Sequence, residues 1–84
     1  MGNKEIANRV IDIIERESPI PRDTFDEKLE YRYIAAGHID SFAIIRLIVS
    51  IEDEFEIVLS PEDIESDEFR LVGGLIGIIE KYCD

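Results

Sequence analysis

Apolar residues in the first part of the chain recur at helical spacing. Those on the predicted buried face are Ile6, Val10, Ile13 and Ile14. Because they lie three or four positions apart, we predict an amphipathic helix from about residue 4 to residue 17, with Asn3 as its N-terminal cap. The helix should end before Pro19 and Pro21, because proline removes a backbone donor and biases the preceding residue toward extended conformations.

A long connection follows, from residue 18 to about residue 39, with one short helical turn expected near Asp26 to Glu30. Its apolar residues, which can attach it to the core, are Phe25, Leu29, Tyr31, Tyr33 and Ile34. Gly37 marks a turn just before the next predicted helix. An ordered connection of this length in a small domain usually has a functional role.

The segment from Ser41 to Phe55 predicts a second long helix with an unusually wide apolar surface. Its core stripe consists of Ile44, Leu47, Ile48, Ile51 and Phe55. Phe42, Ile45 and Val49 lie on the flank and widen the apolar arc to roughly 220°, whereas a surface helix needs a stripe of about 100°. Two interpretations remain open and do not exclude each other: the tyrosines of the long connection cover this flank, and the flank is an exposed strip that binds a partner.

Two further helices are predicted after residue 59. Ser60 is followed by Pro61 and, three positions on, by Asp63, which is typical of the capped start of a short helix. A final helix should span about residues 70 to 82, with Val72, Leu75, Ile76, Ile79 and Tyr82 facing inward. This helix also contains Gly73, Gly74 and Gly77. Each glycine costs about 1 kcal/mol relative to alanine in a helix interior, so we expect either close packing against a neighbour or fraying.

These elements predict an all-α fold: a small four-helix bundle with a long loop between helices one and two and a short third helix. The 84 residues are enough for one small domain, 1–84, and too few to enclose a large pocket. The chain has no internal repeat and no low-complexity segment.

The composition points to a protein with basic partners. Acidic residues number 20 and basic residues 9, so the net charge is −11. Such a surface repels nucleic acids and anionic membranes, and it attracts basic protein faces. Nine carboxylates and no lysine or arginine lie between Glu52 and Glu68, a solvated face that is also a credible docking surface.

Other site classes find little support. The single Cys83 excludes an internal disulfide and a cysteine-rich zinc site, and we interpret it as a passive thiol. The acids after residue 52 lack the spacing of a calcium loop, and Gly73-Gly74 lacks the lysine of a phosphate-binding loop, so no metal is expected. With neither a signal-peptide pattern nor an apolar stretch of membrane-spanning length, the chain is expected to be cytoplasmic and not inserted in a membrane.

The most informative short stretch is Asp40-Ser41, at the start of the second helix. If Asp40 caps the helix, the Ser41 hydroxyl is free; if Ser41 is the cap, its role is structural. A phosphate attached here would be stabilised by unpaired amides and by the helix dipole. His38, Asp40 and Ser41 have the residue types of a nucleophilic triad, but they lie within four positions, and a triad needs side chains that converge from separate segments.

The sequence resembles the acyl carrier protein family. The resemblance rests on Asp40-Ser41-Phe42, where the family usually has Asp-Ser-Leu, and continues through the positions that follow. These are Leu47, Ile51, Glu52-Asp53-Glu54, Phe55, Ile57, Leu59 and Ser60-Pro61-Glu62-Asp63, with a last helix similar to "FRLVGGLIGII". The match covers about residues 4–82 and is strong from 37 to 63.

The resemblance implies that Ser41, preceded by Asp40, carries a 4′-phosphopantetheine arm transferred from coenzyme A. The arm's thiol would hold acyl groups as thioesters, and the carrier itself would catalyse nothing. Its partners would be a phosphopantetheinyl transferase, an acyl-loading ligase or synthase, and an acyltransferase, each meeting a monomeric carrier. The residues implied to contact them are Phe42, Ile45, Arg46, Val49, Glu52, Asp53, Glu62 and Asp63.

Departures from the housekeeping pattern suggest a specialised carrier. Arg46 stands where common fatty-acid carriers tend to be acidic, and the preceding loop is rich in tyrosine. "GHIDSF" is more similar to stand-alone D-alanyl and peptidyl-carrier-like forms. The expected pathway is a specialised lipid, an envelope glycolipid or a secondary metabolite. The alternative is an unmodified acidic helical module that binds a basic protein.

Overall fold

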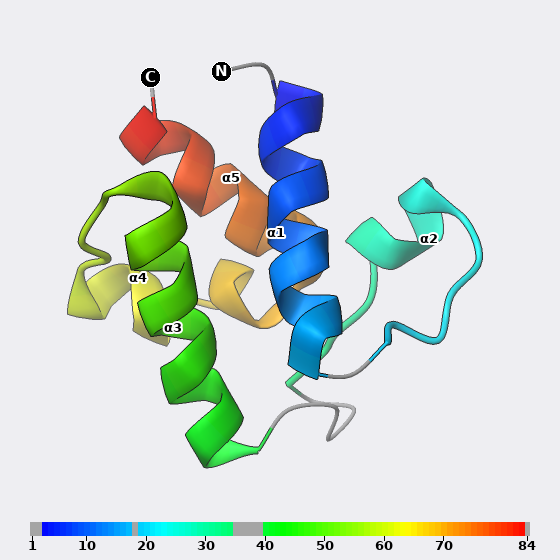
Figure 1. Cartoon of the computed structure of the whole chain (residues 1–84), viewed down its shortest axis with the longest axis horizontal. Helices are drawn as coiled ribbons and strands as arrows, with labels where there is room; N and C mark the ends of the chain where they lie inside the picture. Colours follow the sequence, from blue (N-terminus) through cyan, green and yellow to red (C-terminus); the bar gives the residue numbers. More distant parts are fainter. Residues whose placement is uncertain (1–2, 18, 35–39, 84) are drawn as a thin grey trace.

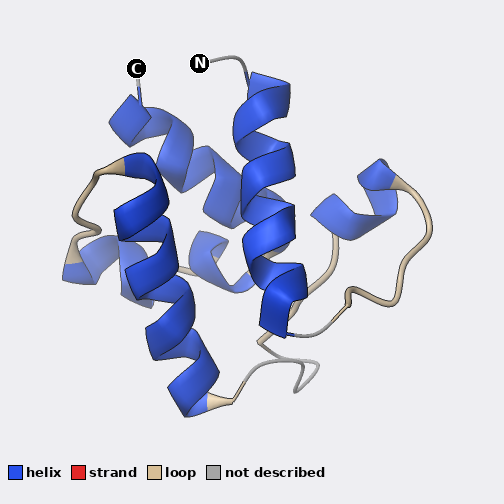
Figure 2. Cartoon of the chain, viewed as in Figure 1, coloured by secondary structure: helices blue, strands red, loops and turns tan. Residues whose placement is uncertain are grey.

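The computed structural model describes residues 3–17, 19–34 and 40–83, and its regular elements are all helical in these ranges (Figures 1 and 2). In chain order they are α1 (Asn3–Glu17), α2 (Phe25–Leu29), α3 (Ser41–Phe55), α4 (Pro61–Glu65), the 3₁₀ turn η1 (Glu68–Arg70) and α5 (Val72–Cys83). The predicted all-α fold class is confirmed. The turn predicted at Gly37 lies outside the described residues.

The three long helices form the core. α1 and α3 run antiparallel, and α5 packs beside α1 (Figure 1). The apolar stripes predicted from the sequence meet there, at side chains that are almost completely buried: Val10, Ile14, Leu47, Ile51, Leu75 and Ile79. The hydrophobic effect acting on these stripes therefore fixes how α3 lies in the bundle.

Two ion pairs specify how α1 and α3 align. Near one end of the seam, Arg9 Nη1 lies 3.4 Å from Glu54 Oε2. Near the other end, Arg46 of α3 binds Glu17 of α1. The basic partner comes from α1 in the first pair and from α3 in the second, so the antiparallel register matches opposite charges at both ends.

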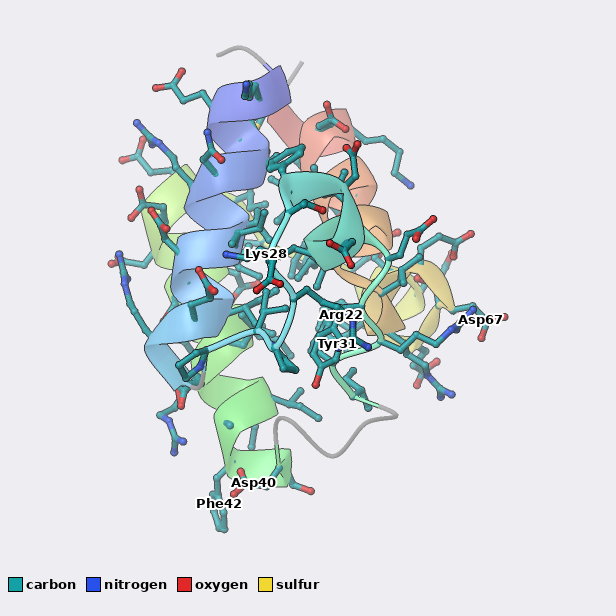
Figure 3. The ribbon with its side chains drawn as sticks, turned by 90° about the vertical axis from the view of Figure 1, so that its right-hand side faces the viewer. Arg22, Lys28, Tyr31, Asp40, Phe42 and Asp67 are labelled. Atoms are coloured by element: carbon teal, nitrogen blue, oxygen red, sulfur yellow. The ribbon has the colours of Figure 1, made fainter. Side chains whose placement is uncertain are left out.

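The long connection is attached to η1 and to the start of α5. The Val72 amide donates to the Tyr31 carbonyl at 3.1 Å. The buried Tyr33 hydroxyl donates to the Phe69 carbonyl, and the two rings meet edge to face with centroids 6.5 Å apart. Burial raises the pKa of Tyr33, so this phenol stays protonated and keeps its donor. Arg22 lies over the Tyr31 ring (Figure 3).

The interpretation in which the loop tyrosines cover the flank of α3 is therefore wrong. The Tyr31 carbonyl accepts a hydrogen bond from Val72 at the start of α5, and the Tyr33 hydroxyl donates one to Phe69 in η1, so both residues satisfy backbone groups there. The flank of α3 is exposed instead.

The last helix begins later than predicted, at Val72 instead of residue 70, because residues 68–70 form the separate turn η1. Close packing accounts for two of its glycines. A Cβ on Gly74 would lie 2.2 Å from the Glu68 carbonyl oxygen, and one on Gly73 would lie 3.0 Å from that of Leu29. The prediction that Tyr82 faces inward is wrong. Its side chain is 36% exposed, because its hydroxyl is hydrogen-bonded to Asp63 at the surface of α4.

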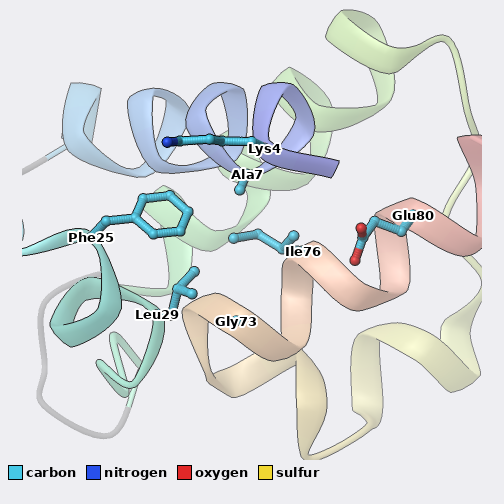
Figure 4. Close-up of a pocket in the computed structure, with 7 residues that line it drawn as sticks. All are labelled: Lys4, Ala7, Phe25, Leu29, Gly73, Ile76 and Glu80. Carbon is cyan, nitrogen blue, oxygen red and sulfur yellow. The ribbon is translucent and has the colours of Figure 1, made fainter. Parts of the chain in front are cut away.

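α2 closes only part of the space beside α1 and α5. An open cavity of about 440 Å³ remains, with Phe25, Leu29 and Ile76 among its lining residues (Figure 4). Lys28 of α2 binds Glu15 of α1 at 3.1 Å and holds the short helix in place. Within the described ranges, no helix is both long and apolar enough to cross a membrane.

Candidate functional site: the start of α3

Asp40 is the N-terminal cap of α3. Its backbone is extended (φ −83°, ψ 179°), and its Oδ1 accepts a hydrogen bond from the Ala43 amide at 2.8 Å. Ser41 is consequently the first helical residue, is exposed, and has no hydrogen-bond partner for its hydroxyl among the described residues. Of the two capping interpretations, the one with Asp40 as the cap is correct.

Ser41 stands beside an exposed apolar surface. Phe42, Ile45 and Val49 are 74%, 59% and 58% exposed, and we call these three residues the apolar strip. Figure 3 shows Asp40 and Phe42 together at the extremity of the molecule, directed away from the bundle. Large apolar side chains that face solvent together are typical of an interaction surface.

Arg46, on the same stretch of α3, is held by α1. Its Nε and Nη2 donate to Oε1 and Oε2 of Glu17, both at 3.0 Å. The hydrogen bond from Arg46 lowers the pKa of Glu17, and the pKa of Arg46 is raised in return. A two-pronged guanidinium–carboxylate contact fixes orientation better than a single ion pair. No local sequence pattern predicts this pairing, because the two residues are 29 positions apart in the chain.

The acidic residues predicted to meet partners have different roles in the structure. Glu52 is half-buried, and its Oε2 accepts from the Leu59 amide at 2.9 Å, so part of its function is to hold the α3–α4 connection. Asp53 and Glu62 are exposed and have no ionic or hydrogen-bonded side-chain partner in the part of the chain that is described. Their charge remains available to a partner.

Asp63 is engaged within the fold. Its amide donates to Ser60 Oγ, while Ser60 Oγ and Tyr82 Oη donate to its Oδ2 at 3.0 and 2.5 Å. Lys81 Nζ lies 3.8 Å from Oδ1. The hydrogen bond from Tyr82 is the main reason that the pKa of Asp63 is lowered. The predicted cap of the short helix is present, and it also attaches α4 to the end of α5.

A metal centre finds no assembled set of ligands in residues 3–17, 19–34 and 40–83. No group of three potential metal ligands occurs there. The triad candidate cannot be assessed at His38, which lies outside the described residues. Within the described part, the start of α3 combines one exposed hydroxyl, the positive end of a helix dipole and adjacent apolar side chains. These features suit a covalently attached anionic group, because a helix N-terminus stabilises negative charge.

Comparison with known proteins identifies the class. The model of a family described as "Phosphopantetheine attachment site" matches residues 6–78. The chain belongs to this phosphopantetheine-binding carrier family. Its cofactor is 4′-phosphopantetheine, and the exposed start of α3 leaves room for such an arm.

Several curated relatives share its length. A D-alanyl carrier protein of Bacillus mycoides (strain KBAB4) is 30% identical over 77 residues, which cover 92% of this chain and 95% of the relative. D-alanyl carrier proteins of Bacillus cereus (strain B4264) and Bacillus anthracis (strain CDC 684 / NRRL 3495) are 29% identical with the same coverage. No solved structure matches the chain.

Proposed function

We propose that Ser41 is the residue that carries the 4′-phosphopantetheine arm. The observation that supports this most directly is the exposed Ser41 hydroxyl, free of described partners, at the first position of a helix that Asp40 already caps. The function of the hydroxyl is then chemical, because the structural task at this helix end is performed by its neighbour.

The other described serines are less suitable. The Ser60 hydroxyl is part of the cap of α4, and the Ser66 hydroxyl donates to the Asp63 carbonyl at 2.6 Å. Ser50 is half-buried in the third turn of α3, far from either helix end. A transferase needs access to the attacking oxygen, so Ser41 is the best candidate among them.

In the proposed modification, Ser41 Oγ loses its proton to a base of the transferase and bonds to the β-phosphorus of coenzyme A. The pyrophosphate bond of coenzyme A breaks, and adenosine 3′,5′-bisphosphate leaves. The attached arm supplies a terminal thiol, on which acyl groups are held as thioesters. Asp40 keeps the first turn of α3 formed, and the amides of that turn face the new phosphodiester.

The protein then acts as a non-catalytic carrier for separate enzymes: the transferase, an acyl-loading ligase or synthase, and an acyltransferase. Tethering the substrate raises its effective concentration at each of these enzymes. We propose that residues 1–84 form one monomeric, cytoplasmic domain. Its contact surface would comprise the apolar strip, Arg46 and the acids Glu52, Asp53, Glu62 and Asp63.

The D-alanyl carrier relatives support a specialised cargo, in an envelope glycolipid, specialised lipid or secondary-metabolite pathway. D-alanine is the first cargo to test. The modified protein would be incubated with ATP, the ligase that loads the B. mycoides relative, and D-alanine, L-alanine or a short fatty acid in parallel. Loading of D-alanine alone onto the arm would support D-alanine as the cargo. Loading of only one of the other acids would make that acid the cargo instead.

The attachment is tested by intact mass spectrometry after incubation with coenzyme A and a broad-specificity phosphopantetheinyl transferase. We expect one phosphopantetheine on the native protein and none on Ser41→Ala, with Ser50→Ala modified normally as the matched control. Circular dichroism checks that each variant is helical. Modification of folded Ser41→Ala would refute the assignment, and a folded native protein that is never modified would favour the unmodified acidic module.

A further inference from the structure

A groove of about 310 Å³ lies between α1 and α3, next to the apolar strip. Ile13 lines it from α1, and Ile45 and Val49 line it from α3. Ile13 is buried, whereas the two strip residues are more than half exposed. The groove therefore extends the exposed apolar strip toward α1 instead of forming a separate cavity.

The charges at the groove are unlike those of the rest of this acidic protein. Arg16, Glu17 and Arg46 all line it. Glu17 is engaged by both nitrogens of the Arg46 contact. The Arg16 side chain is exposed and has no ion pair or hydrogen bond within the described part of the chain. Among the residues that line the groove, positive charge therefore exceeds negative charge by one, although the net charge of the molecule is −11 and the Asp40 carboxylate lies near enough to Arg46 to interact with it.

Two exposed acids outside the groove carry the opposite charge. Asp53, near the end of α3, and Glu62, in α4, are exposed and unpaired among the described residues. The two ends of the exposed surface therefore have opposite electrostatic character. Complementary charge at an interface fixes orientation and partner choice more than it raises affinity.

We propose that the groove between α1 and α3 docks a partner-enzyme segment in which an apolar side chain is adjacent to a carboxylate. The apolar side chain packs against Ile45 and Val49, and the carboxylate binds Arg16. Basic side chains of the same partner meet Asp53 and Glu62. One part of this proposal rests on the proposed function, namely that the partner is an enzyme of the acyl pathway.

A protein segment fits these features better than a membrane does. The net charge of −11 repels anionic lipid surfaces. The groove is also continuous with an exposed apolar strip, which is the arrangement expected for a protein interface with an apolar centre and a charged rim.

The proposal is tested by nuclear magnetic resonance on the unmodified full chain. The probes are an end-blocked peptide of alternating leucine and glutamate and its counterpart with lysine in place of glutamate. We expect the glutamate peptide to shift the amide signals of residues 13–17 and 45–50. The lysine peptide should shift signals around Asp53 and Glu62 instead.

Arg16→Gln should weaken binding of the glutamate peptide by about two- to fivefold, the range of an exposed ion pair. Arg70→Gln is the matched control, because Arg70 lies in η1 and its exposed side chain has no partner among the described residues. The proposal is overturned if the glutamate peptide leaves the groove signals unchanged, if both peptides bind at the groove equally, or if Arg16→Gln and Arg70→Gln behave alike.

These outcomes are independent of the attachment assignment. The peptide measurement uses protein without an arm, so a failure of modification at Ser41 leaves a positive groove result in place. Conversely, normal modification at Ser41 together with a silent groove would refute the groove proposal alone.

Discussion

α3 and α5 are both rich in apolar residues, but they place their apolar surface differently. Five apolar residues of α5 are buried: Val72, Leu75, Ile76, Ile78 and Ile79. α3 buries one face and exposes Phe42, Ile45 and Val49 on the other. Hydrophobicity along a helix therefore does not reveal its purpose. The apolar surface of α5 stabilises the fold, whereas the exposed apolar side chains of α3 are not needed for stability.

The difference arises from the neighbours of each helix. α5 lies against α1, α2 and η1, and glycines at its start let backbones approach closely. α3 contacts the bundle mainly along its seam with α1, and the long connection is bound to η1 and α5 instead of covering the flank of α3.

The largest expected effect is the difference in stability between truncating a buried isoleucine of α5 and truncating an exposed isoleucine of α3. Ile79→Ala should lower the free energy of unfolding by about 2–5 kcal/mol, because Ile79 is fully buried and leaves a cavity. Ile45→Ala should change it by less than about 0.5 kcal/mol, as for other exposed positions. Urea denaturation followed by circular dichroism measures both. If Ile79→Ala does not fold, Ile79→Val, with an expected loss of about 0.5–1.5 kcal/mol, replaces it. Equal losses for Ile45 and Ile79 would remove the contrast between the helices.

The glycines of α5 provide the next test. Gly74→Ala should destabilise the protein by about 1–3 kcal/mol, since its Cβ would meet backbone atoms of Glu68 and force a shift. Gly77→Ala should stabilise it by about 0.5–1 kcal/mol, because nothing lies within 4 Å and alanine is the better helix former. Thermal and urea unfolding of the two variants show directly whether each substitution stabilises or destabilises the protein. Destabilisation by Gly77→Ala would mean that this glycine has a role that its surroundings do not reveal.

A smaller effect is expected at the cap of α3. Asp40→Ala should cost about 1 kcal/mol of stability, because the Ala43 amide loses its acceptor. It should also slow phosphopantetheine attachment, since the first turn around Ser41 frays. Asp40→Asn retains a capping oxygen and is the control. Stability and the rate of attachment are measured on the same samples, and a stable Asp40→Ala protein would contradict the capping role.

The smallest effect concerns Tyr82, near the C-terminal end of α5. Because its hydrogen bond lowers the folded-state pKa of Asp63 below the ordinary 3.8, the contribution of this carboxylate to stability is fully present above that pH. It is lost as the pH falls through the lowered folded pKa. Tyr82→Phe should therefore flatten the fall in stability below about pH 4.

Urea midpoints between about pH 2 and pH 6 measure this effect, a window that spans both the ordinary and the lowered pKa of the carboxyl group. Lys81→Gln is the comparison variant, since Lys81 approaches Asp63 only to 3.8 Å. An unchanged pH profile for Tyr82→Phe would show that the hydrogen bond does not control Asp63.

Local patterns in the sequence predicted most of the fold. The buried stripes of α1 and α3, the start of α4 at Ser60-Pro61 and the capping alternatives at Asp40 all depend on residues within one or two helical turns. Such signals can be read without knowing the tertiary structure. The resemblance to carriers was likewise visible in the order of short motifs.

Features that depend on distant segments could not be predicted in this way. The pairing of Glu17 with Arg46, the attachment of Tyr33 to Phe69 and the bond from Tyr82 to Asp63 each join different elements. The roles of Glu52 and Asp63 were therefore only partly foreseen, because a run of acids shows charge and not which carboxylates the fold already uses. The contact surface itself remains a prediction.

Asp40 and Ser41 divide two tasks between adjacent side chains. The oxygen that satisfies the helix end belongs to one residue, and the oxygen that faces outward belongs to the next. A substituent on the outward oxygen displaces no hydrogen bond among the described residues. The bundle can thus gain or lose a long appendage at this position while its architecture stays the same.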